Sequence, residues 1–129
     1  DHSTPFGVMK AYGDLYSYGV LHFDAHLDLR KAYDGYRHSH ASIMRNVCEL
    51  IPAVEKIVQV GIRDFCQEEI DFVSSEKGRI KVFYDRDLKK AQYSGRSWLE
   101  ICKDIVSELP EKVFISFDID GLDPKLCPS

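Results

Sequence analysis

The feature that most constrains the fold of this 129-residue chain is a regular alternation of short apolar runs with amphipathic segments. The apolar runs are rich in Val, Ile and Phe and are bounded by charged or turn residues, which is typical of strands buried on both faces of a sheet. We expect these strands at residues 18–26, 56–63, 80–85 and 112–120.

Helix-like segments lie before and between these runs, with apolar residues at helical spacing. A Ser-Thr-Pro sequence at residues 3–5 is typical of a helix start, and Pro110 is typical of a helix end. The expected helices span residues 3–16, 39–51, 66–78 and 94–110. Because helices and strands alternate, the sequence predicts an α/β domain with three α/β/α layers and a mainly parallel sheet.

Some expectations concern packing and extent. Met44, Phe72 and Trp98 are expected in the core, and the charged run at residues 85–90 is expected to be a solvated loop. The chain opens without Met and stops before a last element is complete. We therefore expect residues 1–129 to be a partial domain of a longer polypeptide, truncated at both ends.

The composition of the chain argues against several classes of function. Apolar residues make up 44% of it, which is enough for a packed core. The formal charge of −4, without a run of Lys or Arg, argues against binding to nucleic acid or to an anionic membrane. The sequence has no apolar run near the roughly 18 residues that span a bilayer, and no leader, so we expect a cytoplasmic protein. The cysteines form no C-x-x-C pair, which argues against a zinc ribbon or a redox dithiol.

Polar groups interrupt the first apolar run at every second residue. Asp24, His26 and Asp28 follow its apolar part, and charges without partners are costly to bury. Alternate residues of an extended segment project to the same side, so these side chains can point together. The same spacing recurs at Asp118 and Asp120, where the last strand ends.

His2 extends this set, because it precedes the first helix at a point where an earlier strand would normally end. Parallel sheets bind ligands at the carboxyl ends of their strands, and carboxylates crowded there would raise one another's pKa. A bound multivalent cation is the simplest way to neutralise these carboxylates. Carboxylates and imidazoles without thiolates suit Mn²⁺, Fe²⁺ or Zn²⁺, and the carboxylate majority favours Mn²⁺. The set is too large for one tetrahedral site and suits two ions.

Each cluster alone has an ordinary explanation. A single Asp-x-His-x-Asp occurs at strand ends by chance, and residues 118–124 could be an ordinary turn rich in Asp, Gly and Pro. Arg63 and Asp64 could border a pocket or simply follow a strand. We treat His22 and His38 as ordinary polar residues, because the sequence assigns His22 no partner. The metal-site interpretation rests on the clusters occurring together.

The motifs resemble those of the ureohydrolases, the family of agmatinase and arginase. Residues 1–3 (DHS) look like the end of the family motif Gly-Gly-Asp-His-Ser. Residues 24–28 (DAHLD) match Asp-Ala-His-x-Asp, and residues 116–124 (SFDIDGLDP) match Ser-x-Asp-x-Asp-x-x-Asp-Pro. The resemblance covers the chain from end to end and implies the α/β/α fold of arginases and deacetylases.

The resemblance also implies a centre of two Mn²⁺ ions bridged by a hydroxide that attacks a guanidinium carbon. The implied ligands are His2, Asp24, Asp28 and Asp118 for one ion, and Asp24, His26, Asp118 and Asp120 for the other, so that Asp24 and Asp118 bridge. Asp28 would also orient the hydroxide. His40 would relay a proton to the leaving amine, or it is merely an exposed residue at a helix start capped by Ser39.

The segment after the second motif bears on the substrate. Arginases carry an Asn-rich stretch and a Ser-Gly-Asn-x-His-Gly element there, whereas residues 29–42 read LRKAYDGYRHSHAS and resemble agmatinases. The resemblance therefore favours hydrolysis of agmatine to putrescine and urea, in polyamine biosynthesis, by a homo-oligomer. Arginase, formimidoylglutamase or guanidinobutyrase activity stays open, as does a non-catalytic metal-binding module. The deacetylase branch shares the sheet, but the acids at 118 and 120 argue against it.

Overall fold

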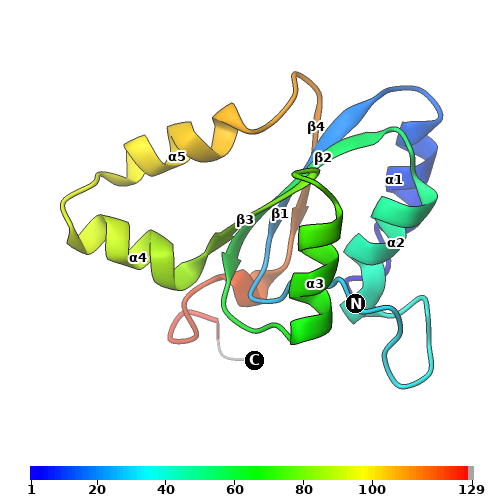
Figure 1. Cartoon of the computed structure of the whole chain (residues 1–129), viewed down its shortest axis with the longest axis horizontal. Coiled ribbons are helices and arrows are strands. Elements are labelled where there is room, and N and C mark those ends of the chain that lie inside the picture. Colours follow the sequence, from blue (N-terminus) through cyan, green and yellow to red (C-terminus); the bar gives the residue numbers. More distant parts are fainter. Residues whose placement is uncertain (128–129) are drawn as a thin grey trace.

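The computed structural model describes residues 1–127, and its centre is a 4-stranded parallel sheet with strand order β3-β2-β1-β4 (Figure 1). The strands are β1 (Tyr18–Phe23), β2 (Val54–Ile62), β3 (Ile80–Tyr84) and β4 (Val113–Phe117). The helices are α1 (Phe6–Gly13), α2 (Ile43–Leu50), α3 (Gln67–Ser75), α4 (Asp85–Tyr93) and α5 (Trp98–Ser107), with 3₁₀ turns η1 (His40–Ser42) and η2 (Ile119–Gly121).

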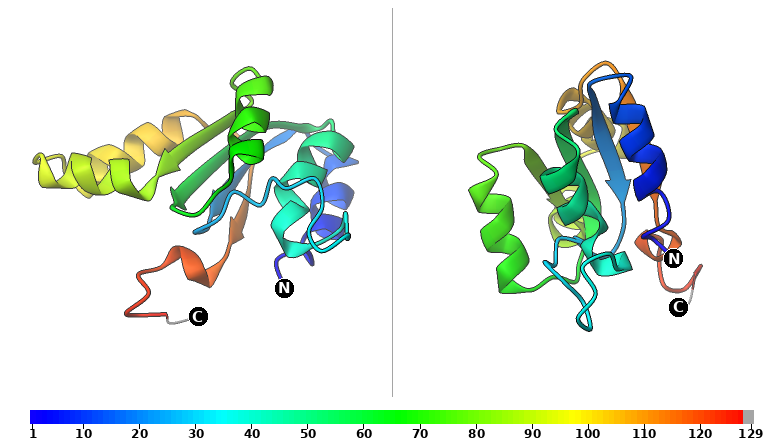
Figure 2. Two further views of the ribbon diagram at one scale, coloured as in Figure 1. Left: turned by 60° about the horizontal axis from the view of Figure 1, so that its bottom comes forward. Right: turned by 90° about the vertical axis from the view of Figure 1, so that its right-hand side faces the viewer.

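The helices cover both faces of the sheet, which confirms the three-layer prediction. Helices α1, α2 and α3 lie on one face, where Met9, Val47 and Ile57 belong to one buried cluster (Figure 2). Helices α4 and α5 lie on the other face, where Leu88 and Ile105 belong to a second cluster. Burial of apolar side chains on both faces stabilises such a sheet at roughly 25 cal/mol per Å² removed from water.

The strand order places a crevice between β1 and β4. The chain leaves β1 toward β2 and β3 on one side, and the α4–α5 crossover then carries it to β4 on the other side of β1. In open parallel sheets a ligand site lies outside the carboxyl ends of the strands at such a switch point. The segments that follow β1 and β4 therefore meet in this crevice.

Several of the expected elements differ from the structure, and the last strand, expected to reach residue 120, ends at Phe117 before η2. The charged run predicted as a loop forms helix α4, with Asp85 and Asp87 in its first turn and Leu88 buried against the sheet. Acidic residues at a helix N-terminus stabilise the helix by interacting favourably with its dipole. Lys89 also forms an ion pair with Asp85 at 2.9 Å, one turn apart on the helix. The first strand ends at Phe23 rather than at residue 26, because the chain then turns.

The packing expectations hold only in part. Met44 is buried and Phe72 is partly buried against the same cluster. The expectation for Trp98 is wrong, since this residue is 49% exposed. Trp98 begins α5 at the α4–α5 turn, which projects beyond edge strand β3 and away from the sheet (Figure 1).

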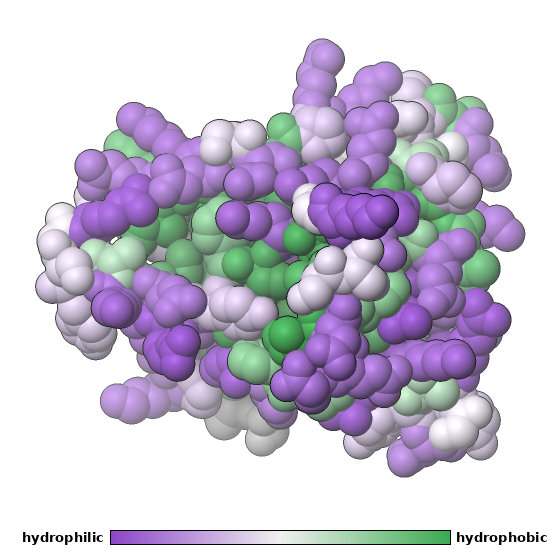
Figure 3. All heavy atoms as spheres, in the orientation of Figure 1, coloured by the Kyte–Doolittle hydropathy of each residue, from purple (hydrophilic) through white to green (hydrophobic). Residues whose placement is uncertain are grey.

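The surface of the face seen in Figure 3 is mainly hydrophilic along the helices, with hydrophobic residues gathered near its middle, over β3. Edge strand β3 is only partly covered, since Val82, Phe83 and Tyr84 are half-buried. Within residues 1–127, none of the helices combines the length and the apolar character that a membrane span requires.

Ile57 provides a test of the packing on the α1–α3 face. Its side chain is fully buried, so Ile57→Ala should lower the free energy of unfolding by about 2–5 kcal/mol, through lost burial and a cavity. Leu99→Ala is the control, because Leu99 is exposed on α5 and its truncation should change this quantity by less than about 0.5 kcal/mol. Urea unfolding measures both. Equal losses in the two variants would contradict the assigned core.

Candidate metal centre

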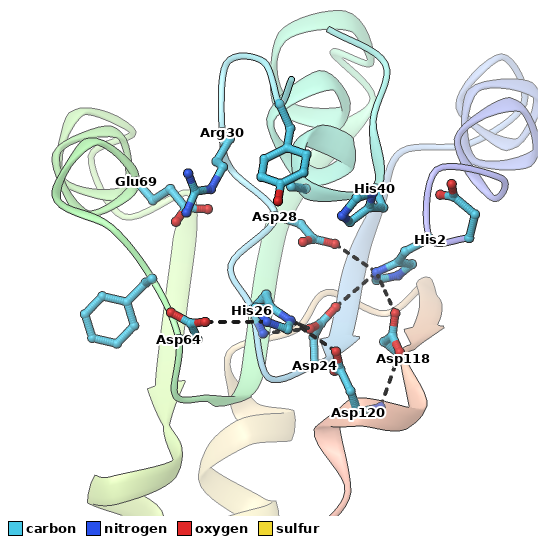
Figure 4. A pocket seen from close by; sticks show the side chains of 14 residues that line it. His2, Asp24, His26, Asp28, Arg30, His40, Asp64, Glu69, Asp118 and Asp120 are labelled. Atoms are coloured by element: carbon cyan, nitrogen blue, oxygen red, sulfur yellow. Dashed lines mark hydrogen bonds and ion pairs between the residues drawn. The ribbon is translucent and has the colours of Figure 1, made fainter. Parts of the chain in front are cut away.

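A cavity of about 500 Å³ opens at the carboxyl ends of β1 and β4 (Figure 4). It is lined by all the residues that the sequence analysis singled out as ligands or catalytic groups: His2, Asp24, His26, Asp28, His40, Asp118 and Asp120. These residues come from the segment before α1, from the turns after β1 and β4, and from η1. The fold thus brings together residues more than a hundred positions apart.

Asp24 sits at the centre of this group and is buried at the end of β1. Its Oδ1 accepts a hydrogen bond from the backbone N–H of His26 at 2.6 Å, which closes a local turn of the Asx type. The expected extended segment is therefore replaced by a turn, and the turn rather than strand alternation sets where His26 points. His26 Nδ1 lies 3.1 Å from Asp120 Oδ2.

Asp28 is held by an unusual backbone conformation. Its φ of 53° lies in the left-handed region, which is costly for a residue with a Cβ. The Asp28 carbonyl accepts hydrogen bonds from the backbone N–H groups of Met44 (3.0 Å) and Arg45 (3.2 Å), at the start of α2. Helix α2 thereby anchors the loop, and the buried carboxylate of Asp28 reaches His2, with 2.9 Å between Oδ2 and Nδ1.

The turn after β4 is fastened to the end of β1. Asp120 Oδ1 accepts a hydrogen bond from the backbone N–H of Ala25 at 3.1 Å, and the Arg63 guanidinium donates to the carbonyls of Asp120 and Leu122. A Cβ added to Gly121 would lie 3.0 Å from the backbone nitrogen of Asp24, so a larger residue there would push the two turns apart. Arg63 therefore holds the turn, and Asp64 lines the cavity.

His2 faces three carboxylates with one ring nitrogen. Nδ1 lies 3.0 Å from Asp24 Oδ2, 2.9 Å from Asp28 Oδ2 and 3.5 Å from Asp118 Oδ2. Within residues 1–127 this buried Nδ1 nevertheless has no partner in hydrogen-bond geometry. The other ring nitrogen, Nε2, lies 2.8 Å from Ser116 Oγ, which orients the ring. An imidazole nitrogen aimed between carboxylates in this way suits a shared cation.

The ligand atoms fall into two groups that share Asp24. The atoms within each group all lie within 4.8 Å of one another, and the groups are His2, His22, Asp24 and Asp28, and Asp24, His26 and Asp120. Among the described residues, Asp118 belongs to neither group. Its Oδ1 accepts a 3.3 Å hydrogen bond from the backbone N–H of Asp120. The bridging position of Asp24 fits this arrangement, whereas the bridging role of Asp118 stays a prediction.

The electrostatics of the cavity reflect crowded acids with imidazoles between them. Burial lowers the pKa of His2, but the Asp24 and Asp28 carboxylates outweigh it and raise that pKa to about 10. Burial raises the pKa of Asp24, yet the neighbouring imidazoles of His2 and His22 bring it well below its usual range. Burial raises the pKa of Asp28, and burial together with the charge of Asp24 raises that of Asp120.

The donor set fits divalent cations. In the part of the chain that the structure describes, no Lys or Arg forms an ion pair with Asp24, Asp28, Asp118 or Asp120, so only imidazoles offset their charge. Carboxylate and imidazole donors without a thiolate match the preferences of Mn²⁺, Fe²⁺ and Zn²⁺. A pair of ions placed in the two groups would neutralise the acids and use the free Nδ1 of His2.

Sequence analysis missed a polar row beneath these ligands. The expectation that His22 has no partner is wrong, because its Nε2 lies 2.9 Å from Asp24 Oδ2 and its Nδ1 lies 2.9 Å from Gln59 Nε2. Gln59, His22 and Ser116 are in register on adjacent strands. The signal was present, since each places one polar residue inside an otherwise apolar run. His38 lies apart, beside Phe6.

His40 lines the cavity from η1. Its ring packs edge-on against Tyr33, with 5.2 Å between centroids, and Tyr33 lies under the guanidinium of Arg30. Ser39 makes no capping hydrogen bond to the backbone of this turn; its hydroxyl lies 2.9 Å from that of Ser42. His40 is exposed and faces the cavity, so it can reach a bound molecule.

Comparison with known proteins gives a consistent result. The sequence profile described as "Arginase family" matches residues 1–129. The chain is 34% identical over 131 residues to the N(1)-aminopropylagmatine ureohydrolase of Synechocystis, covering 99% of this chain and 39% of that protein. It is 36% identical over 128 residues to the agmatinase of Pyrococcus horikoshii, covering 99% of this chain and 39% of that protein.

Solved structures show the same similarity in three dimensions. The arginase of Medicago truncatula superimposes with a TM-score of 0.78 at 30% identity, over 99% of this chain and 38% of that one. The chain thus spans about 40% of the length of the curated relatives it matches. The shared part contains the crevice between β1 and β4.

Gly121 provides a test of how the centre is held. In Gly121→Ala the new methyl would meet backbone atoms of Phe23 and Asp24, which cannot rotate away, so the turn carrying Asp118 and Asp120 must shift. We expect Mn²⁺ affinity, measured by isothermal titration, to fall by about 10–100-fold, as for other losses of ligand orientation. Gly7→Ala is the control, since nothing lies within 4 Å of its added Cβ. Unchanged affinity in Gly121→Ala would contradict the tight approach of the two turns.

Proposed function

The chain belongs to the arginase family, and from that premise we propose that it forms the metal-binding part of a hydrolase that converts agmatine to putrescine and urea. Two Mn²⁺ ions are the proposed cofactor. A cytoplasmic location, a role in polyamine biosynthesis and homo-oligomeric assembly belong to the same proposal.

The single observation that carries this proposal is the convergence on His2. Its buried Nδ1 lies within 3.5 Å of three carboxylate oxygens without forming a hydrogen bond among the described residues. Such an arrangement is unfavourable for a solvent-filled pocket and favourable for cation coordination. The proposed ligands are His2, Asp24, Asp28 and Asp118 for one ion, and Asp24, His26, Asp118 and Asp120 for the other.

When bound, two divalent ions supply Lewis acidity that makes water nucleophilic near neutral pH. The residues of the chain then have distinct tasks. Asp28, buried on the inner wall of the cavity, accepts a hydrogen bond from the attacking water and so orients it toward the planar guanidinium carbon.

His40 is placed to supply the proton that the departing amine needs. An imidazole exchanges protons near neutral pH, which suits general acid catalysis. His40 is exposed to the cavity, and its ring is held by Tyr33 rather than by a carboxylate. This contact orients the ring, and within residues 1–127 neither ring nitrogen is used in a hydrogen bond, so both can meet a substrate or water.

Agmatine is favoured over arginine by the loop between Asp28 and η1. The two elements that arginases carry there, as given in the sequence analysis, are replaced in this chain by residues 29–42 (LRKAYDGYRHSHAS). Asp1 and Asp64 also line the cavity and suit the amine of agmatine. Several relatives carry the names agmatinase and N(1)-aminopropylagmatine ureohydrolase, which refer to agmatine or to an aminopropyl derivative of it.

Arg30 favours a second candidate, a guanidino acid. Its guanidinium lines the same cavity, stacks 5.7 Å from the Tyr33 ring centroid and forms no ion pair within residues 1–127. A carboxylate on the substrate tail would form an ion pair with the Arg30 guanidinium. Guanidinobutyrate has such a tail, and arginine and formiminoglutamate carry carboxylates as well.

Two substitutions separate metal binding from proton transfer. Asp118→Asn should weaken Mn²⁺ binding by about 100-fold or more and abolish turnover, since it removes a proposed shared ligand. His40→Asn should retain both ions, while kcat falls by about 10²–10⁴-fold through loss of the proton donor. Metal analysis and urea release from the full-length protein measure both effects.

Asp104→Asn serves as the control for these variants, because Asp104 pairs with Arg96 on the surface of α5, away from the cavity. It should bind metal and turn over substrate as the parent protein does. Equal metal loss in Asp118→Asn and His40→Asn would contradict the separate roles.

A substrate screen decides between the two candidates. The Mn²⁺-loaded full-length protein should release urea fastest from agmatine when tested with agmatine, arginine and guanidinobutyrate, and formamide release tests formiminoglutamate. Arg30→Met should leave kcat/KM for agmatine unchanged or higher, because a like charge is removed. A preference for guanidinobutyrate that disappears in Arg30→Met would instead establish the guanidino acid, and a protein without bound metal would refute both candidates.

A further inference from the structure

A buried polar row crosses the sheet directly beneath the ligand carboxylates. It consists of Gln59 in β2, His22 in β1 and Ser116 in β4, which are paired in register across the three strands. All three are buried on the face covered by α1 and α2, with Gln59 and His22 fully inaccessible. Ser116 orients His2, whereas the function proposed above uses neither Gln59 nor His22.

The hydrogen bonds of Gln59 fix the orientation of its amide. Nε2 lies 2.7 Å from the carbonyl oxygen of Leu27 and 2.9 Å from Nδ1 of His22. A carbonyl oxygen only accepts, so the amide must present its NH₂ group to Leu27. The second hydrogen of the same group then points at Nδ1 of His22, which must act as the acceptor.

This leaves one arrangement of hydrogens on the His22 ring. Because Nδ1 accepts, the ring carries its hydrogen on Nε2, which lies 2.9 Å from Oδ2 of Asp24. The other oxygen of Asp24, Oδ1, accepts from the backbone N–H of His26 at 2.6 Å. Both carboxylate oxygens of Asp24 are therefore held by donors on the protein side, and their remaining lone pairs face the cavity.

While the amide nitrogen of Gln59 donates these two hydrogen bonds, its side-chain carbonyl oxygen is left without one. Its Oε1 is buried and has no hydrogen-bond partner within residues 1–127. A buried oxygen without a partner is unfavourable, and an apolar side chain of the same length would avoid that cost. The two donated hydrogen bonds therefore account for an amide in the middle of a central strand.

We propose that Gln59 and His22 are positioning residues for the metal centre. Gln59 sets the hydrogen of His22 on Nε2, and His22 in turn fixes the carboxylate of Asp24, the residue that both ligand groups share. The His22 ring also packs 5.0 Å, between centroids, from the ring of His2. The inference rests on the proposed function, because the orientation of Asp24 matters only if Asp24 binds a cation.

Mn²⁺ affinity of the full-length protein tests the positioning role. His22→Leu and Gln59→Met, which remove the donors at similar volume, should each weaken Mn²⁺ binding by about 10–100-fold. His22→Gln should retain affinity within about threefold, since its amide nitrogen can take the place of Nε2 as a donor. Isothermal titration and the electron paramagnetic resonance of bound Mn²⁺ give the affinities without reference to turnover.

Val58→Ala is the matched control for a merely structural effect. Val58 is as buried as its neighbour Gln59, but it packs on the opposite face of β2, in the cluster of α4 and α5. Its truncation should lower stability and leave Mn²⁺ affinity unchanged. Equal loss of affinity in Val58→Ala and Gln59→Met would overturn the positioning role, as would parental affinity in both Gln59→Met and His22→Leu.

The hydrogen on His22 is read directly from the ¹⁵N chemical shifts of its ring in the metal-free protein. We expect it on Nε2 in the parent protein, and we expect this preference to weaken in Gln59→Met. A hydrogen on Nδ1 in the parent protein would overturn the inference. This measurement also separates the two proposals: a protein that binds no Mn²⁺ yet shows the expected shifts refutes the proposed function and retains the Gln59–His22 contact.

Discussion

The carboxylates of Asp24, Asp28, Asp118 and Asp120 share one edge of a parallel sheet, and the rest of the cavity is arranged around their mutual repulsion. No Lys or Arg of the described chain pairs with them, so imidazoles and, in the proposed enzyme, metal ions must offset their charge. Two of the four are buried, where an uncompensated charge costs several kcal/mol. In the proposed enzyme, bound cations would remove this cost.

Several independent backbone turns and hydrogen bonds hold these acids in place. Asp24 closes a turn on His26, Asp28 adopts a left-handed conformation fastened to the start of α2, and Asp120 binds the backbone of Ala25. Because backbone hydrogen bonds fix each of these three residues, their positions do not depend on a cation. Such preorganisation is what a metal site requires to hold ions at a defined geometry.

The position of the cavity follows from the topology. The strand order β3-β2-β1-β4 places β2 and β4 on opposite sides of β1, and the turns after β1 and β4 meet at the carboxyl ends of these two strands. His2 enters the cavity from the segment before α1 and is tied to β4 through Ser116. The polar row of Gln59, His22 and Ser116 lies in the sheet beneath the ligands. Its hydrogen bonds join Gln59 to His22, His22 to Asp24, and Ser116 to His2.

The sequence by itself determined the layered α/β class, the strand positions to within a few residues, and the chemical type of the site, because apolar periodicity and repeated acid spacing are local patterns. Only the tertiary structure decided how the site residues converge, since turns rather than strand alternation aim His26 and Asp28. Whether residues 85–93 form a helix and whether Trp98 is exposed depend on which side chains of α4 and α5 pack against the sheet. The partners of His22 were invisible for the same reason: its contact with Gln59 joins strands that are distant along the chain, and register between strands is fixed only when the sheet has formed.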